Sequence, residues 1–385
     1  MSDRKLAILF IVAVVMVMLA VIQSQISTGP AQPETPGYLI TGLNTDRIGS
    51  IVIGKGDDII TLKRVVPRFV VTNKDNYPAK ISEINNLLTK CQEIRWTQFI
   101  TDNPANHEDL DVAEENARGI VRFLTPEPNS AILAGVATGK TREVGEGTYV
   151  RLLSSDKKSS DKVYLAQDVP FFNNDVMDYI EQMLISCKFE DIESVTVASS
   201  SGEYTLKADP NSKEIILENI PEGKKLKAGE SKNVFTALAN FRFDDVRKTT
   251  SGLLFDRKYV CRLKNTAVYT IDIARKDDET YIICDADFTD TFERPTKDET
   301  DEQLKEKEAK LLAWESAKDF SLKHKGWIYK IPQWNAKNMT MELSGLLDDD
   351  TARETEIPAE PNSAGIDKLI DSPNIEDANS VKPEQ

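Results

Sequence analysis

The sequence has few of the residues from which catalytic and metal sites are commonly built. Among its 385 residues there are two histidines, His107 and His324, and four cysteines, none of them in a C-x-x-C pair. Zinc sites take their ligands from such pairs and from histidine, so a zinc site is not expected. The G-x-S-x-G motif of serine hydrolases is also missing. We therefore predict no catalytic residue, no cofactor and no metal, and a protein that is not an enzyme.

Both histidines lie in polar stretches of the chain. His107 is within residues 103–109, and His324 has Lys323 and Lys325 on either side. Histidine is mostly partly exposed in proteins, and polar neighbours favour hydration. We predict that both side chains are solvated and that neither acts as a general base.

Basic residues are fewer than acidic ones. The sequence has 48 lysines and arginines and 63 aspartates and glutamates, which gives a net charge of −15. No basic stripe offsets the repulsion from phosphates, so nucleic acid is not an expected partner. Acidic clusters occur at residues 108–111, 244–245 and 285–290. Paired carboxylates can bind calcium or hydrolyse glycosides, but none of these clusters has the spacing of a calcium loop. We predict that they are solvated surface.

One segment, residues 135–141, approaches a phosphate-binding motif; its sequence is G-V-A-T-G-K-T. A phosphate-binding loop needs four residues between the glycines so that backbone amides surround the phosphates, and this segment has only three. Glu143 and Glu146 follow it and disfavour a triphosphate. We predict a hairpin turn in which glycine provides positive φ.

Residues 6–22 form an uninterrupted apolar run that follows Arg4 and Lys5. As a helix this run spans roughly 26 Å, close to the thickness of a membrane core. It is longer than the apolar part of a signal peptide and lacks an A-x-A-like site, which favours an uncleaved anchor, with a cleaved signal as the alternative. The basic residues are expected to stay inside. We predict a cytoplasmic N-terminus (1–5), a single-pass transmembrane anchor (6–22), a linker (23–37) and an extracytoplasmic bulk.

The bulk of the chain has the pattern of an α+β protein with mainly antiparallel sheets. Helical spacing of apolar residues predicts one helix over residues 81–91, a second over 176–187 and a third near 234–241. Strands are predicted at residues 48–53, 59–63, 119–124, 149–153 and 163–166, and again at 192–197, 204–207, 259–263, 267–273 and 280–286. Because the order strand–strand–helix–strands recurs, we predict two tandem α+β repeats, residues 38–190 and 191–347.

The C-terminal part of the second repeat carries a charged helical insertion, residues 297–325, with few apolar residues. We expect its contacts with the rest of the protein to be made by Leu304, Leu311, Leu312 and Trp314. A strand at 326–331 and a helix at 335–347 follow. The acidic tail, residues 348–385, cannot bury enough surface to offset its ordering entropy, and we predict that it is disordered.

The four cysteines, Cys91, Cys187, Cys261 and Cys284, fall on predicted helices and strands. The simplest interpretation is that all four are buried thiols. If the domain lies in an oxidising compartment, Cys261 and Cys284 are the pair that the strand positions suggest for a bridge.

Four aromatic residues are candidates for contacts with a ligand or a partner: Trp96, Trp327, Tyr329 and Trp334. The last three flank a short strand and Pro332. Two interpretations remain open, core packing of a strand that closes the second sheet, and stacking against a ligand.

Several short segments resemble the bacterial domain of unknown function 4340. They are residues 48–53 with 59–63, residues 147–151 followed by 162–165, and the segment G-W-I-Y-K-I-P-Q-W at 326–334. The resemblance extends over most of residues 38–347, whereas the charged helix and the acidic tail depart from it. It implies no catalytic residues. It does imply an accessory protein anchored at the inner membrane of a Gram-negative-type envelope, working in the periplasm beside gliding-type ABC transporter permeases.

The leading hypothesis is therefore a non-enzymatic accessory or scaffold subunit of an ABC-type transport or envelope-assembly complex. The alternative is a periplasmic module that binds a glycan or a peptide in a cleft between the repeats. A third hypothesis is an envelope hydrolase that uses two of the clustered carboxylates.

Overall fold

The computed structural model describes residue 16 and residues 36–349, apart from residues 210–211, 213, 250 and 292–299. All but one residue of the predicted anchor (6–22), most of the linker (23–37) and nearly all of the tail (348–385) lie outside the described residues. Within the described part of the chain, no helix is long and apolar enough to cross a membrane.

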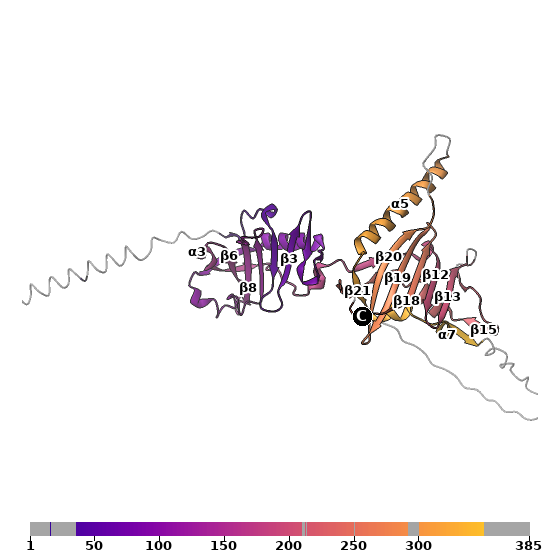
Figure 1. The fold of residues 1–385 in the computed structure, drawn as a ribbon. Coiled ribbons are helices and arrows are strands. Elements are labelled where there is room, and N and C mark those ends of the chain that lie inside the picture. Colours follow the sequence, from indigo (N-terminus) through magenta and orange to yellow (C-terminus); the bar gives the residue numbers. More distant parts are fainter. Residues whose placement is uncertain are drawn as a thin grey trace, which may run out of the picture.

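The first lobe, residues 36–180, is built around a ten-stranded sheet in which every pairing is antiparallel (Figure 1). In spatial order the strands are β1 (Gly37–Tyr38), β6 (Arg95–Thr101), β10 (Val163–Gln167), β9 (Thr148–Leu153), β8 (Ile132–Thr141), β7 (Gly119–Leu124), β2 (Ser50–Ile53), β3 (Ile60–Val65), β4 (Arg68–Val71) and β5 (Tyr77–Pro78). The helical segments are η1 (Thr45–Arg47), η2 (Thr72–Lys74), α2 (Ile81–Glu93), η3 (Pro104–Asn106), α3 (Lys157–Ser160) and η4 (Val176–Tyr179).

The second lobe, residues 181–349, contains an eight-stranded antiparallel sheet and two short two-stranded sheets. The large sheet runs β14 (Ile215–Leu217), β13 (Gly202–Ala208), β12 (Ile192–Ser199), β18 (Phe255–Leu263), β19 (Ala267–Lys276), β20 (Glu279–Phe288), β21 (Ile328–Ile331) and β17 (Asp245–Arg247). The short sheets pair β11 (Met183–Ile185) with β16 (Phe241–Arg242) and β15 (Lys224–Leu226) with β22 (Leu347–Asp349). The helical segments are η5 (Phe189–Asp191), α4 (Ala228–Phe235), α5 (Asp301–His324), α6 (Gln333–Met339) and α7 (Leu343–Leu346).

Strand and helix formation follows the apolar spacing of the sequence. Along β12 the buried residues Ile192, Val195 and Val197 face the core, and in α2 the buried residues are Ile84, Leu87 and Cys91, which lie on one helical face. Most buried apolar side chains of both lobes belong to one continuous core cluster, and a small second cluster in the first lobe contains Ala117, Ile120, Ala137 and Leu153. The predicted mixed helix-and-sheet fold with mostly antiparallel strands is therefore confirmed.

The two large sheets have the same strand order when strands are matched by their place in the chain. In each, the first long hairpin (β2–β3 or β12–β13) lies beside a meander (β7 to β10, or β18 to β21). In each, the strand that follows a helix (β6 after α2, β17 after α4) pairs with the last strand of the meander.

Residues 135–141 form the interior of strand β8, so the prediction of a hairpin turn is wrong. Gly135 pairs with Leu153 and with Arg122, between the two neighbouring strands. A Cβ atom at Gly139 would lie 2.2 Å from the carbonyl oxygen of Leu110, and one at Gly135 would lie 2.6 Å from that of Val121. The glycines are required because backbone passes close to the strand, not because a turn needs positive φ.

The helix predicted over residues 176–187 is also absent. Its first turn is the 3₁₀ helix η4, after which Ile180 is extended and the chain forms strand β11. Strand β11 pairs with β16, nearly sixty residues further along the chain. Helical spacing of apolar residues over so short a stretch was overridden by this long-range pairing.

Helix α5 is present where the charged insertion was predicted, but the contacts expected of its three leucines are wrong; Trp314 is half-buried and lines a hollow with Ala286 and Phe288 of β20. The buried residues of α5 are Ala313, Ala317 and His324, whereas Leu304, Leu311 and Leu312 are exposed. The alanines lie against β20 and β19 because small side chains allow the helix to approach the sheet closely. Figure 1 shows that the N-terminal part of α5 extends away from the sheet.

The C-terminal elements differ slightly from the prediction. The expected helix at 335–347 is two short helices, α6 and α7. Asp348 and Asp349, predicted to begin the disordered tail, are part of strand β22 and pair with Lys225 and Lys224 of β15. Opposite charges along this short ribbon favour the pairing.

Replacing Gly139 by alanine is expected to lower the free energy of unfolding by about 1–3 kcal/mol, because the added methyl group collides with backbone that cannot move independently. The control is Gly229→Ala in α4, where nothing lies within 4 Å of the new methyl group. That substitution should leave stability unchanged or raise it by up to about 1 kcal/mol. Urea denaturation of both variants measures the difference, and equal effects would contradict the packing explanation.

Candidate functional site: the junction between the lobes

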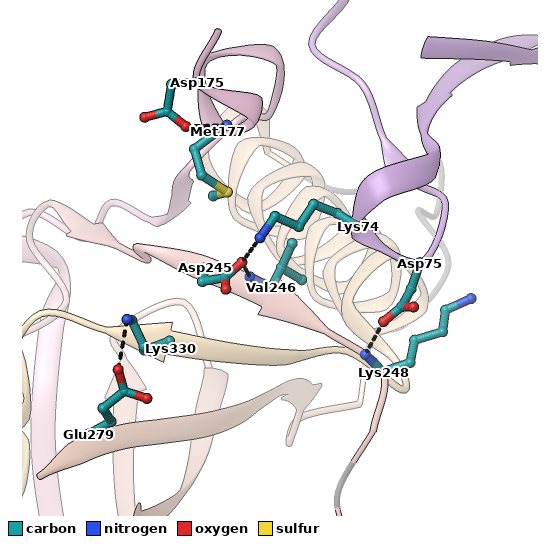
Figure 2. A network of polar contacts seen from close by, with 9 residues as sticks. All are labelled: Lys74, Asp75, Asp175, Met177, Asp245, Val246, Lys248, Glu279 and Lys330. Atoms are coloured by element: carbon teal, nitrogen blue, oxygen red, sulfur yellow. Dashed lines mark hydrogen bonds and ion pairs between the residues drawn. The ribbon is translucent and has the colours of Figure 1, made fainter. Parts of the chain in front are cut away.

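The two lobes meet at the free edges of their large sheets, where β5 ends the first sheet and β17 ends the second. Lys74 at the end of η2 places its Nζ 2.7 Å from Oδ1 of Asp245 on β17. The backbone N–H of Lys248 donates to Oδ2 of Asp75 at 3.0 Å. Figure 2 shows these two contacts side by side, each joining the first lobe to the second. The turn that contains Lys74 is thus held by charged and backbone groups of the opposite lobe.

Asp245 is positioned by its own lobe as well as by Lys74. Its Oδ1 accepts from the N–H of Val246 at 2.7 Å. On the neighbouring strand β21, Lys330 forms an ion pair with Glu279 of β20 at 2.9 Å (Figure 2). The charged groups on this side of the second sheet are therefore paired within the sheet or across the junction.

A cluster of aromatic rings lies behind the ionic contacts. Tyr77 on β5 is only 3% exposed, although it belongs to the two-residue edge strand of the first sheet. Its ring makes edge-to-face contacts with Trp327 at 4.8 Å, Phe243 at 6.0 Å and Tyr329 at 6.3 Å between centroids. All three partners belong to the second lobe. One aromatic side chain of the first lobe is therefore packed in the core of the second.

A buried hydrogen bond joins Tyr329 of this cluster to His324. The hydroxyl of Tyr329 lies 2.6 Å from Nδ1 of His324. Burial lowers the pKa of His324 to about 4, with a smaller contribution from Lys323, and burial raises the pKa of Tyr329. At neutral pH the imidazole is thus uncharged, and its Nδ1 shares a hydrogen bond with the Tyr329 hydroxyl.

A cleft of about 550 Å³ opens beside the junction, between helix α2 and the segment that leads into β11. It is lined by both lobes and by charges of both signs. The cationic lining residues are Lys80, Lys90 and Arg242, and the anionic ones are Glu83, Asp178 and Glu181. Phe171, which is 86% exposed, also lines it. Such a lining suits a polar ligand that carries both charges, or no net charge.

Residues 70–253 match the family described as a domain of unknown function, DUF4340. This segment of the chain resembles DUF4340. The match covers slightly less than half of the chain. A comparison with curated proteins and with solved structures finds no match to either.

The DUF4340 segment runs from β4 of the first lobe to the end of β17 and beyond, and it therefore contains Tyr77 and both ionic contacts of the junction. Of the segments that suggested the family, residues 147–151 and 162–165 lie inside the match. Residues 48–53, 59–63 and 326–334 lie outside it, so the family match is narrower than the resemblance over residues 38–347.

The four residues predicted to contact a ligand or a partner do not come together in one site. Trp327 and Tyr329 meet in the aromatic cluster and are 8% and 0% exposed. Trp96 on β6 is 9% exposed and packs against Tyr164 at 4.9 Å. Trp334, at the start of α6, is 60% exposed. Sequence reasoning missed Tyr77, because a single tyrosine before a proline shows no periodicity that indicates burial.

The prediction that both histidines are solvated is wrong. His324 is 2% exposed because it lies on the same face of α5 as Ala317, whereas its neighbours Lys323 and Lys325 are exposed. His107 is 4% exposed, in the first lobe; its Nδ1 accepts from Nη1 of Arg151 at 3.1 Å, and its Nε2 lies 2.9 Å from the carbonyl oxygen of Asp161. Burial lowers the pKa of Arg151, although nearby carboxylates oppose the effect. Both imidazoles are satisfied structural groups.

All four cysteines are buried free thiols, and the suggested pair is wrong. Cys261 lies on β18 and Cys284 on β20, with β19 between them. Two strand spacings amount to about 9–10 Å, too far for a disulfide. Cys261 instead lies near Cys187; this neighbour lowers the pKa of Cys187, and together with burial it raises the pKa of Cys261.

The acidic clusters do not converge on one site in the described residues. Asp245 is bound at the junction, Asp290 pairs with Lys310 of α5 at 3.0 Å, and Asp285 accepts from the hydroxyl of Ser321. Burial raises the pKa of Asp244. In the same part of the chain, no three histidine, cysteine or carboxylate groups are placed to hold a metal ion.

Tyr77→Ala is expected to lower the free energy of unfolding by about 3–5 kcal/mol, the usual cost of removing a buried aromatic ring. Lys74→Ala should cost about 1 kcal/mol or less, because the ion pair with Asp245 is partly exposed. Trp334→Ala is the control for an exposed ring and should change stability by about 0.5 kcal/mol or less. Denaturant titration of the three variants tests this order. A larger loss from Lys74→Ala would show that the ion pair dominates the junction.

The low pKa of His324 predicts a pH dependence of stability. The unfolded chain takes up a proton near pH 6.5, whereas the folded protein does so only near pH 4. The contribution of the neutral His324 side chain to the free energy of unfolding is therefore fully present above about pH 6.5, and it is lost as the pH falls to about 4. The advantage of the wild type over His324→Gln should shrink by on the order of 3 kcal/mol between pH 7 and 4. An advantage that stays constant with pH would contradict the assignment.

Proposed function

We propose that this DUF4340 protein is a membrane-anchored extracytoplasmic scaffold, an accessory subunit of an ABC-type transport or envelope-assembly complex, and not an enzyme. The observation that supports this most is the junction. One buried ring and two polar contacts hold two large sheets in a fixed relation, with a common core. A body of this kind presents sheet edges and helix faces at constant separation, which suits a subunit that organises partners.

We also propose that the two lobes arose by internal duplication, with repeats 38–190 and 191–347. The shared strand order supports this, because eight strands of each sheet correspond in chain order and in position. The connection from hairpin through helix to the far edge of the sheet is unusual enough that its recurrence favours duplication over coincidence. Two related sheets would offer partners two related surfaces.

The proposed location is the inner membrane, with residues 6–22 as the anchor and residues 1–5 in the cytoplasm. Support comes from the apolar run and from Arg4 and Lys5 before it. The first described strand, β1, starts at Gly37, where the proposed linker ends. The folded lobes would then lie in the periplasm at the end of this linker.

The test is affinity purification of the full-length protein from native membranes in mild detergent, followed by mass spectrometry. An ABC permease and its ATPase are expected in amounts comparable with the bait. The control bait carries residues 1–37 fused to an unrelated soluble domain, and should recover neither. A full-length bait that is reproducibly recovered without a membrane partner would contradict the scaffold proposal.

The cleft beside the junction supports a second candidate, a module that binds a peptide or a glycan with both charges or none. Its volume of about 550 Å³ and its lining from both lobes favour this alternative. A panel of zwitterionic peptides and envelope glycan fragments can be screened by the shift in melting temperature. A shift that disappears in Lys90→Ala and Arg242→Ala, but not in Lys305→Ala on α5, would move this candidate ahead of the scaffold.

A further inference from the structure

The outer face of helix α5 carries a line of exposed leucines. At 3.6 residues per turn, Leu304, Leu311 and Leu322 lie within about 20° of one another around the helix, and about 180° from Ala313, which is buried against the sheet. The three leucines are 38%, 39% and 64% exposed. These leucines supply apolar surface on one line of the helix for contact with a partner helix.

Leucines occupy three of the six positions on one seam of helix α5, and the other three positions are charged. The six positions are separated by alternating steps of four and three residues: Leu304, Glu308, Leu311, Glu315, Lys318 and Leu322. This is the 3.5-residue repeat that keeps one face of a helix against a partner helix. Helix α5 is 24 residues long and begins with a capping box at Thr300, so the surface is presented by a well-terminated helix.

We propose that this seam binds the same seam of a second copy of the chain, with the two α5 helices antiparallel and centred on residue 313. In that register each Leu304 packs against Leu322 of the other copy. Each Glu308 faces Lys318, so two ion pairs form across the seam, and Leu311 lies against the aliphatic part of Glu315. In this single register the leucines are packed and Glu308 and Lys318 are paired.

Charge is what selects this arrangement over a parallel pair. Parallel helices in register would place Glu308, Glu315 and Lys318 each opposite its own copy, which juxtaposes like charges at three of the six positions. The antiparallel pair replaces two of these repulsions by attractions. It also has a two-fold axis perpendicular to the helices, so the interface is self-complementary and closes at two copies.

This pairing is independent of the scaffold proposal, since it concerns only copies of this chain. The measurement is the mass of the full-length protein in mild detergent by light scattering with correction for bound detergent. Two copies per particle are expected for the wild type. Leu304→Asp and Leu322→Asp should each raise the dissociation constant by at least about tenfold, because a buried apolar contact is replaced by an unpaired charge. Leu312→Asp is the matched control, since Leu312 is exposed on α5 but lies off the seam.

Charge exchange separates the proposed register from a general loss of folding. Glu308→Lys alone and Lys318→Glu alone should each weaken the dimer, whereas the double variant E308K/K318E should restore it. Glu302→Lys, an equal change of charge off the seam, should have no effect. A monomeric wild type, a dimer that survives both aspartate substitutions, a particle with one copy and another protein, or a double variant without recovery would each overturn the proposal.

Discussion

Burial of the Tyr77 ring is the interaction on which the arrangement of this protein depends. An aromatic side chain enclosed by Trp327 and Phe243 contributes several times what a partly exposed ion pair does, because nearly its whole apolar surface is removed from water. The ion pair of Lys74 with Asp245 forms only in one relative orientation of the two lobes. Ring burial holds the lobes together, and the charges select the orientation in which they meet.

The same burial explains the chemistry of the polar groups around the ring. Removal of water leaves His324 uncharged, and an uncharged imidazole can accept the proton of Tyr329. A charged imidazole at this place would have neither water nor an anion beside it. The hydrogen bond between Tyr329 and His324 is thus a consequence of packing, and it ties α5 to β21.

The packing of helix α5 shows what determines the face of a helix that is buried against a sheet. A run of glutamate, lysine and leucine has no strong apolar side, and leucine seemed the natural contact residue. Ala313 and Ala317 are the residues that pack on the sheet instead. With these small side chains the backbone of α5 comes closer to the sheet than leucines would allow, and closer packing gives more favourable dispersion contacts. The leucines are thereby left on the outer face, in the line that defines the proposed dimer seam.

The sequence by itself determined the class of fold, most strands and helices, and the charged helix, because these depend on local periodicity, and its short motifs indicated the resemblance to DUF4340. Its period-two and period-3.6 patterns predicted β12 and α2 correctly. Only the tertiary structure decided that residues 135–141 are a strand interior, that Met183–Ile185 forms a strand, that both histidines are buried, and that Cys187 rather than Cys284 meets Cys261. Each of these depends on neighbours far away in the chain. Desolvation and close backbone approach are properties of those neighbours, and no local pattern encodes them.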